Sequence, residues 1–419
     1  MGISWYLIRH SSRDKMSVQS TEEAIAGLSL DPNSNVTTPS TTTAAISTDP
    51  SSNEETTNEV KEEEEVNQES DVEKAVRLYE DDRLLEAGRV LNSISDKSVL
   101  EKIHENISRK ATLGEALIQD LKSADLDDGK HTTDNNDDDS NNGGWVIHGV
   151  SKGEFPTLTA HKLEKNGTSV ELKARVETPI DNSMLSPFIS VLNETELYET
   201  WLPSWTVPKF KVQRCQKLSQ TGRCSQVLIV TFDLPWPIAS REVVLLADAF
   251  DDIDAKGDIG IRLETLSTGD ENGLVPPPDK SVVRIDVNGG FLIRKCPSNH
   301  PALLLDEDDE DNDEKKVVDE KNDTTDGDAA KDEKILITFA ATMNPKLKLL
   351  PQSFLNFLVK VAFGIAWSIL LKIARDVKNG KREDHQKAIQ EKREALYDWV
   401  ELRLKALLSF NNEIQITGI

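Results

Sequence analysis

Apolar and charged side chains alternate along residues 169–180, where Val170, Leu172, Ala174 and Val176 lie between charged neighbours. A period of two places alternate side chains on opposite faces of a β-strand. Six further apolar stretches are separated by Gly, Pro, Asn and Asp turn signals: residues 207–216, 225–234, 241–250, 258–267, 281–295 and 334–343. Short strands joined by turns predict a mostly antiparallel sheet of about seven strands, and residues 184–200 between the first two favour a helix.

Residues 71–122 have a different pattern, in which apolar side chains recur at helical spacing. Asp71 and Ser95 stand where helix N-caps are expected, and they predict two amphipathic helices that form a hairpin. The apolar stripe of such a hairpin must be buried somewhere. We therefore expect it to dock on the rest of the chain or to self-associate, and it is a candidate surface for a protein partner.

The longest apolar element is expected at residues 352–378, as a helix that begins after Pro351 and ends near Lys378. Its uninterrupted apolar core, Val361–Leu371, has eleven residues, whereas a transmembrane helix needs ~20. We therefore predict that the helix packs lengthwise on the concave face of the sheet. Residues 379–410 continue with a thin apolar stripe, which either extends this helix or pairs with residues 71–122.

Charge divides the chain into segments. The formal net charge is −25, yet residues 145–305 and 335–410 together hold 27 acidic and 30 basic residues. Polar, acidic segments cannot bury enough apolar surface to offset the entropy of ordering. Residues 1–70 are therefore expected to be disordered, 123–144 to be an acidic linker, and 306–334 to be a disordered insertion in a domain spanning 145–378, with 379–410 as a C-terminal extension. A pI of 4.8 also argues against a nucleic-acid partner.

The chemistry-bearing residues exclude several classes of protein. The three cysteines give neither a disulfide framework nor zinc-ligand spacing, which suits a reducing, cytoplasmic setting. The first residues show no secretory signal. The sequence has no dinucleotide-binding glycine motif, P-loop, zinc-protease motif or serine nucleophile elbow. We therefore expect no metal or cofactor and disfavour an enzyme.

Four segments, taken in order, resemble the START family of lipid-transfer domains: VLNETELYETWLPSW (191–205), DLPWPIASREVVLLADAF (233–250), VPPPDKSVVRIDVNGGFLI (275–293) and ATMNPKLKLLPQSFLNFLVKVAFG (341–364). The resemblance covers about 145–378, whereas the acidic insertion and the N-terminal 144 residues depart from it. It implies an α+β helix-grip fold, in which a curved antiparallel sheet is covered on its concave face by a long C-terminal helix. The residues that carry it, which we expect to maintain the fold, are Trp201, Pro235, Trp236, Pro237, Arg241, Gly289, Gly290, Pro345 and Pro351.

The resemblance also implies binding, and intermembrane transfer or sensing, of a lipid in an internal apolar cavity, with transient peripheral contact to a membrane surface. The expected cavity walls come from alternate strand positions and the final helix: Leu228, Val230, Val243, Leu245, Val283, Ile285, Ile337, Phe339, Phe357, Val361, Ile365, Trp367 and Ile369. One alternative is a cyclase or isomerase that uses the same cavity, with Arg175, Arg262 or Asp286 as its polar group. Another is a scaffold, in which residues 71–122 and the acidic segments recruit partners.

Overall fold

The computed structural model describes residues 70–95, 101–123, 145–166, 169–202, 204, 210–234, 238–304, 333–346 and 363–417. All of them belong to one compact unit, Asn67–Ile419. Nearly all of the N-terminal region 1–70, the linker 123–144 and the insertion 306–334 lies outside the described residues. The same holds for Pro235, Trp236, Pro237, Pro351, Phe357 and Val361.

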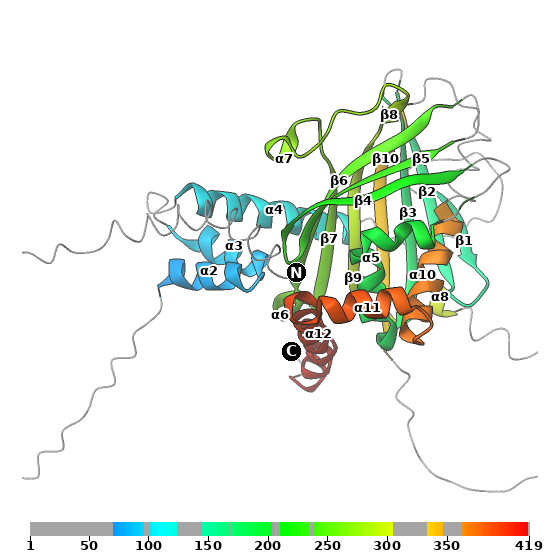
Figure 1. The fold of residues 1–419 in the computed structure, drawn as a ribbon. Coiled ribbons are helices and arrows are strands. Elements are labelled where there is room, and N and C mark those ends of the chain that lie inside the picture. Colours follow the sequence, from blue (N-terminus) through cyan, green and yellow to red (C-terminus); the bar gives the residue numbers. More distant parts are fainter. Residues whose placement is uncertain are drawn as a thin grey trace, which may run out of the picture. The chain divides into compact units, whose positions relative to one another are not determined.

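A ten-stranded sheet dominates the described part of the chain (Figure 1). Neighbours along the order β1-β2-β3-β10-β9-β7-β6-β5-β4 are antiparallel, and β8 pairs in parallel with β6. The strands are β1 (Val146–Ser151), β2 (Thr157–Asn166), β3 (Ser169–Asp181), β4 (Lys211–Gly222), β5 (Ser225–Asp233), β6 (Ser240–Asp252), β7 (Asp258–Thr265), β8 (Val282–Arg284), β9 (Asp286–Lys295) and β10 (Lys334–Asn344).

Two strands, β1 and β2, precede the first strand that the sequence predicted. β1 is an edge strand without a fully buried side chain, and its pairing with β2 shifts register between Ile147 and Val150. A strand with so little to bury shows no clear alternation of apolar and polar residues. The single strand expected at 281–295 is divided, because β8 pairs with β6 whereas β9 pairs with β7 and β10.

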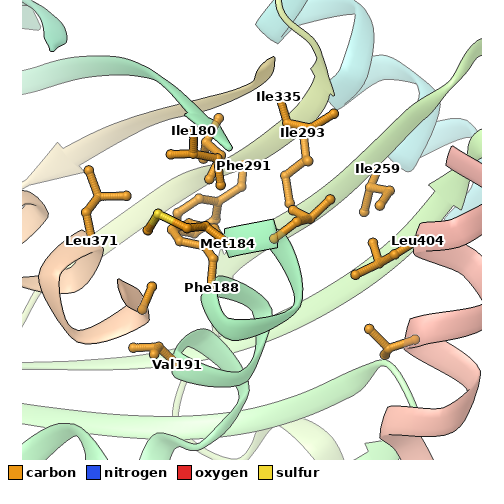
Figure 2. Packing of buried hydrophobic residues seen from close by; sticks show 14 of the residues in the cluster. Ile180, Met184, Phe188, Val191, Ile259, Phe291, Ile293, Ile335, Leu371 and Leu404 are labelled. Atoms are coloured by element: carbon orange, nitrogen blue, oxygen red, sulfur yellow. The ribbon is translucent and has the colours of Figure 1, made fainter. Parts of the chain in front are cut away.

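The concave face of the sheet carries the main hydrophobic core. Phe291 and Ile293 of β9 point to this face, where Ile337 and Val176 of the neighbouring strands join them. Helix α5 (Leu185–Asn193) and helix α10 (Gly364–Lys378) pack against these side chains, so that Phe188 and Leu371 are fully buried (Figure 2). The short 3-10 helices η2 (Asn182–Met184) and η3 (Thr195–Thr200) flank α5, which places helical structure where the sequence predicted it.

The opposite, convex face of the sheet is covered by the N-terminal helices. Leu292, whose side chain alternates with those of Phe291 and Ile293, packs there with Ala111 and Ile118 of α4 (Lys102–Ser123). The expected pair of helices is in fact three, since α2 (Asp71–Glu80) and α3 (Leu84–Ser93) are separate. Asp82 has a φ of 60° and ends the first helix, a left-handed conformation that helical periodicity does not reveal. The N-cap is Ser70, whose hydroxyl accepts the N–H of Glu73 in a capping box.

The C-terminal segment bends twice after α10. Gly380, with a φ of 71°, ends that helix before α11 (Glu383–Glu391). A π-helix, η5 (Arg393–Tyr397), then leads into α12 (Asp398–Thr417). Tyr397, Val400 and Leu407 are buried in the main core, so the segment 379–410 is a structural part of the domain and does not continue α10.

Three one-turn helices complete the described residues: α6 (Ile253–Lys256), α7 (Asp270–Gly273) and α8 (Pro301–Leu304). Within the described ranges, no helix has the length and hydrophobicity needed to cross a bilayer. The predicted α+β helix-grip arrangement is confirmed: a curved, almost entirely antiparallel sheet with a C-terminal helix on its concave face.

Two of the expected fold-maintaining features lie among the described residues. A Cβ on Gly289 would lie 2.2 Å from the carbonyl oxygen of Ala340, and one on Gly290 would lie 2.1 Å from that of Ile261. The pair lies in regular register with both neighbouring strands, so it allows close approach of backbone and does not form a bulge. Arg241 is buried and donates to the carbonyl oxygen of buried Pro345 at 3.1 Å.

Candidate ligand-binding cavity

A cavity of about 320 Å³ lies between the concave face of the sheet and the helices that cover it. On the strand side its walls come from β5, β6, β7 and β9. On the helix side they come from α5, η3, α10, η5 and α12. The cavity therefore lies within the helix grip, where the resemblance placed a ligand.

Small side chains on one strand create much of this space. Ala247 and Ala249 of β6 face the cavity, and they pair in register with Leu263 and Ile261 of β7. A leucine at either alanine position would extend into the volume that is now open. Close packing normally fills protein interiors, so a pair of alanines between larger neighbours leaves room for a ligand.

The lining is mostly apolar. The strands contribute Leu228, Val230, Leu245, Ile259, Ile261, Leu263 and Phe291, and the helices contribute Ile189, Leu192, Leu370, Leu396, Trp399, Val400 and Leu404. Trp201 also lines the cavity, and its ring packs at 5.1 Å from that of Tyr198. Such a lining favours an apolar ligand, because burying apolar surface is worth ~25 cal/mol per Å².

Polar side chains gather at the end of the cavity formed by the β4–β5 turn and the end of β6. Arg403 of α12 forms a bidentate pair with Asp251, at 2.8 and 3.0 Å. Burial raises the pKa of Asp251 although Arg403 opposes the shift. Arg223 pairs with Asp82 at 2.7 Å, and its guanidinium carbon lies 5.3 Å from the ring centroid of Trp399. Each of these arginines thus already has a carboxylate partner.

A second polar group anchors α12 next to the cavity. Tyr397 donates a 2.6 Å hydrogen bond to Glu194, which also pairs with Lys392. Burial alone would raise the pKa of Glu194, but the hydrogen bonds from Lys392 and Tyr397 hold it below its ordinary value. Glu194 caps α5, and Lys392 and Tyr397 stand at the two ends of the π-helix, so this cluster joins η5 to the end of α5. We assign it a structural role.

The thirteen predicted wall residues fall into distinct places. Leu228, Val230 and Leu245 line the cavity. On the same face of the sheet, Val243 and Ile285 are buried in the same cluster as Leu228 and Leu245 but do not line the cavity. Ile337 and Trp367 belong to the main core, and partly buried Phe339 packs against it. Val283 lies in β8, Ile369 is half-buried on α10, and Ile365 is 38% exposed. Phe357 and Val361 lie outside the described residues.

The sequence interpretation missed the contribution of η5 and α12. Leu396 and Val400 belong to the thin stripe noted at 379–410, but Trp399 and Leu404 were not singled out. The stripe was the available signal, and its ambiguity came from the bends before it. The described part of α10 contributes Leu370, which was not predicted, to the lining. None of the predicted α10 residues in the described range, Ile365, Trp367 and Ile369, lines the cavity.

The polar residues proposed for an enzyme do not reach this cavity. Arg175 lies on the opposite face of β3, where it is fully buried and donates to Glu177 and to the carbonyl oxygen of Leu121. Arg262 pairs with Glu264, and Asp286 pairs with Lys346 near the surface. The one thiol in the lining, Cys224, has its pKa raised by burial, which disfavours the nucleophilic thiolate. Among the described residues, no three His, Cys, Asp or Glu side chains are grouped as metal ligands.

No protein-family model matches the sequence, and no curated protein matches it. Solved structures do match. Human STARD10 is 16% identical over 68% of this chain and 87% of its own, with a TM-score of 0.39. Human StAR-related lipid transfer protein 5 is 12% identical over 64% and 98%, with a TM-score of 0.38. A STAR-related lipid transfer protein fragment from Xanthomonas axonopodis is 18% identical over 55% and 99%, with a TM-score of 0.35.

Matches with identities and TM-scores this low do not establish a function. A functional proposal for this chain must come from the geometry of the cavity itself. The chain is similar to these solved structures, two of which are named as StAR-related lipid transfer proteins.

Proposed function

We propose that this chain binds a lipid or a similar apolar ligand in the cavity between the sheet and α5, η5 and α12, and that it carries or senses that ligand at membrane surfaces. The observation that supports this most is an apolar cavity of about 320 Å³ in the middle of an otherwise packed core. An unfilled space of this size costs stability, and a ligand that fills it recovers that cost.

The volume indicates how much of a ligand the closed cavity holds. A water-sized group occupies ~30 Å³, so the cavity accommodates on the order of ten such groups. Ten buried methylenes contribute ~8 kcal/mol. One chain segment or a compact ring system therefore fits the closed form, whereas a two-chain lipid would require α12 or α5 to move outwards.

Transfer between membranes would use a face that touches a bilayer for a short time. One lysine that could meet anionic headgroups is Lys346, which lies in an exposed pair with Asp286 at 3.1 Å. An exposed pair of this kind contributes little to stability, so anionic headgroups could compete for the lysine. Membrane contact remains part of this proposal.

Native mass spectrometry of the full chain after incubation with mixed-lipid vesicles tests the binding function. We expect a bound mass that survives removal of the vesicles and that organic extraction releases as a lipid. Protein that stays empty after incubation with phospholipid, sterol, ceramide and fatty-acid vesicles would rule out the proposal. Transfer is then measured as lipid movement between donor and acceptor vesicles.

A further inference from the structure

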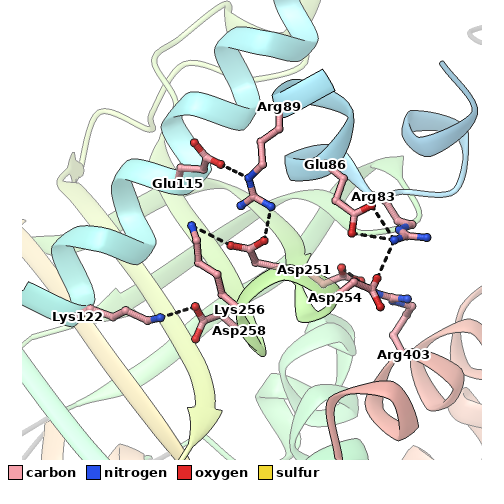
Figure 3. A network of polar contacts seen from close by, with 11 residues as sticks. Arg83, Glu86, Arg89, Glu115, Lys122, Asp251, Asp254, Lys256, Asp258 and Arg403 are labelled. Carbon is pink, nitrogen blue, oxygen red and sulfur yellow. Dashed lines mark hydrogen bonds and ion pairs between the residues drawn. The ribbon is translucent and has the colours of Figure 1, made fainter. Parts of the chain in front are cut away.

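The turn between β6 and β7 carries four carboxylates that pair with basic side chains of the N-terminal helices and of α12 (Figure 3). We call this segment, Asp251–Asp258, the acidic turn. From the N-terminal helices, Arg89 pairs with Asp252 at 2.6 Å and Lys122 with Asp258 at 2.5 Å. The acidic turn is therefore a fixed point at which the helices of the convex face are held to the sheet.

One carboxylate of the acidic turn is shared by the two ends of the chain. The same oxygen of Asp254, Oδ2, accepts from Arg83 at 2.8 Å and from Arg403 of α12 at 2.6 Å. Arg403 lines the cavity and also pairs with Asp251. Arg403, which holds α12 over the cavity, is thus connected to Arg83 of the N-terminal helices through the carboxylate of Asp254.

A second path joins the same elements. Asp82, between α2 and α3, pairs with Arg223 at 2.7 Å, and Arg223 covers the ring of Trp399 on α12. Both Arg223 and Trp399 line the cavity. Two adjacent residues of the N-terminal helices, Asp82 and Arg83, therefore reach two different residues of α12, each through one intermediate side chain.

The helix that receives these contacts is attached in a way that permits motion. α12 follows the π-helix η5, and π-helical turns are frequent at functional sites. On the cavity side, Val400 and Leu404 face open volume, so α12 has fewer apolar contacts to lose there than a helix over a filled core. The ion pairs of Arg403 and the cation–π contact of Trp399 therefore contribute a larger share of the free energy that keeps α12 in its closed position.

We infer that the N-terminal helices brace α12 in its closed position through Asp82 and Arg83, so that displacing them opens the cavity. This inference rests on the proposed function for its consequence, because an open α12 would exchange ligand faster. The opening itself is a property of the protein without ligand, and it can be measured separately.

Hydrogen–deuterium exchange on the full chain tests the brace. The variant Asp82→Asn/Arg83→Met removes both ion pairs, and asparagine tolerates the positive φ at position 82. We expect backbone amides of 398–407 to exchange about threefold to tenfold faster, as the loss of two partly exposed ion pairs predicts. Unchanged exchange in that segment, or equal acceleration throughout the sheet, would overturn the inference.

Arg89→Met is the matched control. It removes a pair between the same helices and the same acidic turn, but Asp252 does not line the cavity. We expect faster exchange in α3 and α4 with less than a twofold change in 398–407; equal acceleration there would show that the contacts of Asp82 and Arg83 are not special. In an Arg403→Met background, Arg83→Met should accelerate exchange in 398–407 by a smaller factor than it does in the wild-type protein. If the two substitutions accelerate exchange by factors that simply multiply, the shared role of Asp254 is contradicted.

A fluorescent fatty-acid probe gives the functional readout. If the wild-type chain takes up the probe, the Asp82→Asn/Arg83→Met variant should release it about threefold to tenfold faster. A chain that stays empty with every lipid of the vesicle panel but still shows the exchange change would refute the proposed function and leave the brace standing. Normal uptake with an unchanged release rate would refute the brace.

Discussion

The indole Nε1 of Trp367 donates a 2.9 Å hydrogen bond to Oγ1 of Thr178, and both side chains are buried. The bond joins α10 to the C-terminal part of β3, and the Thr178 hydroxyl lies a further 2.9 Å from that of Thr157 on β2. Trp367 also stacks on Phe291 at 6.3 Å between ring centroids. One side chain thus supplies both apolar packing and the polar contact that fixes where α10 rests.

Replacing Trp367 should therefore destabilise the domain beyond the loss of apolar area. We expect Trp367→Phe to lower the free energy of unfolding by about 1–3 kcal/mol, because it loses packed volume and removes a buried donor. Denaturant titration measures this. The double variant with Thr178→Val should cost less than the sum of the single changes. Strict additivity would mean that the hydrogen bond contributes nothing.

Filling the cavity should separate binding from folding. We expect Ala247→Phe to weaken uptake of a lipid probe at least about tenfold while the free energy of unfolding changes by less than about 1 kcal/mol, because the ring enters open volume. Ile365→Phe is the control, since it adds the same ring at a position that is 38% exposed. It should bind like the wild type. Uptake by Ala247→Phe at the wild-type level would place the ligand elsewhere.

His385 should make the domain less stable in mild acid. It is fully buried on α11, and neither ring nitrogen has a hydrogen-bond partner among the described residues. Burial lowers its pKa below the ordinary value of 6.5, with Asp384 opposing the shift. In the unfolded chain the ring takes up a proton near pH 6.5, whereas the folded chain resists it. The free energy of unfolding should therefore fall as the pH drops from about 6.5, until the lower folded pKa is passed.

Urea titrations at pH 7.5, 6.5 and 5.5 measure that slope. His385→Leu removes the titrating group and keeps the site apolar, so its stability should vary less over this range. If the substituted and wild-type proteins lose stability in parallel between pH 6.5 and 5.5, another group is responsible.

Gly290 should tolerate no side chain. A Cβ there would lie 2.1 Å from the Ile261 carbonyl oxygen and 2.9 Å from Cδ2 of Leu117 on α4, so the backbone of β7 would have to move and the Leu117 side chain would have to shift. We expect Gly290→Ala to cost about 1–3 kcal/mol or more, as overpacked cores do. Gly222→Ala is a suitable comparison, because its Cβ would meet only Ser225, at 3.6 Å. Equal thermal stability of the two variants would contradict the close packing at Gly290.

The faces of the sheet could be predicted from the sequence because alternation determines them. Leu228 and Leu245 were both expected to face inwards; they pair directly and both line the cavity. A strand's period of two makes this a local property. Whether an inward side chain meets a cavity or the core depends on what covers it. Val243, two residues before Leu245 on β6, belongs to the same buried cluster but does not line the cavity.

The covering helices were harder to predict for the same reason. The apolar stripe at Leu396 and Val400 could be seen in the sequence, but its direction depends on the bend at Gly380 and on the π-helix. Similarly, the break at Asp82 depends on a left-handed residue that is not glycine. Such backbone turns are set by tertiary contacts like the pair of Asp82 with Arg223, which no local periodicity encodes.

The two alanines of β6 have a consequence for how this scaffold can diversify. The side chains of Ala247 and Ala249 limit the depth of the cavity, whereas the backbone pairing of β6 with β7 does not depend on them. Adding or removing one or two carbons at either position would shorten or lengthen the accepted guest without rebuilding the domain. In related sequences, larger side chains at these two positions are therefore expected to go with shorter ligands, and smaller side chains with longer ones.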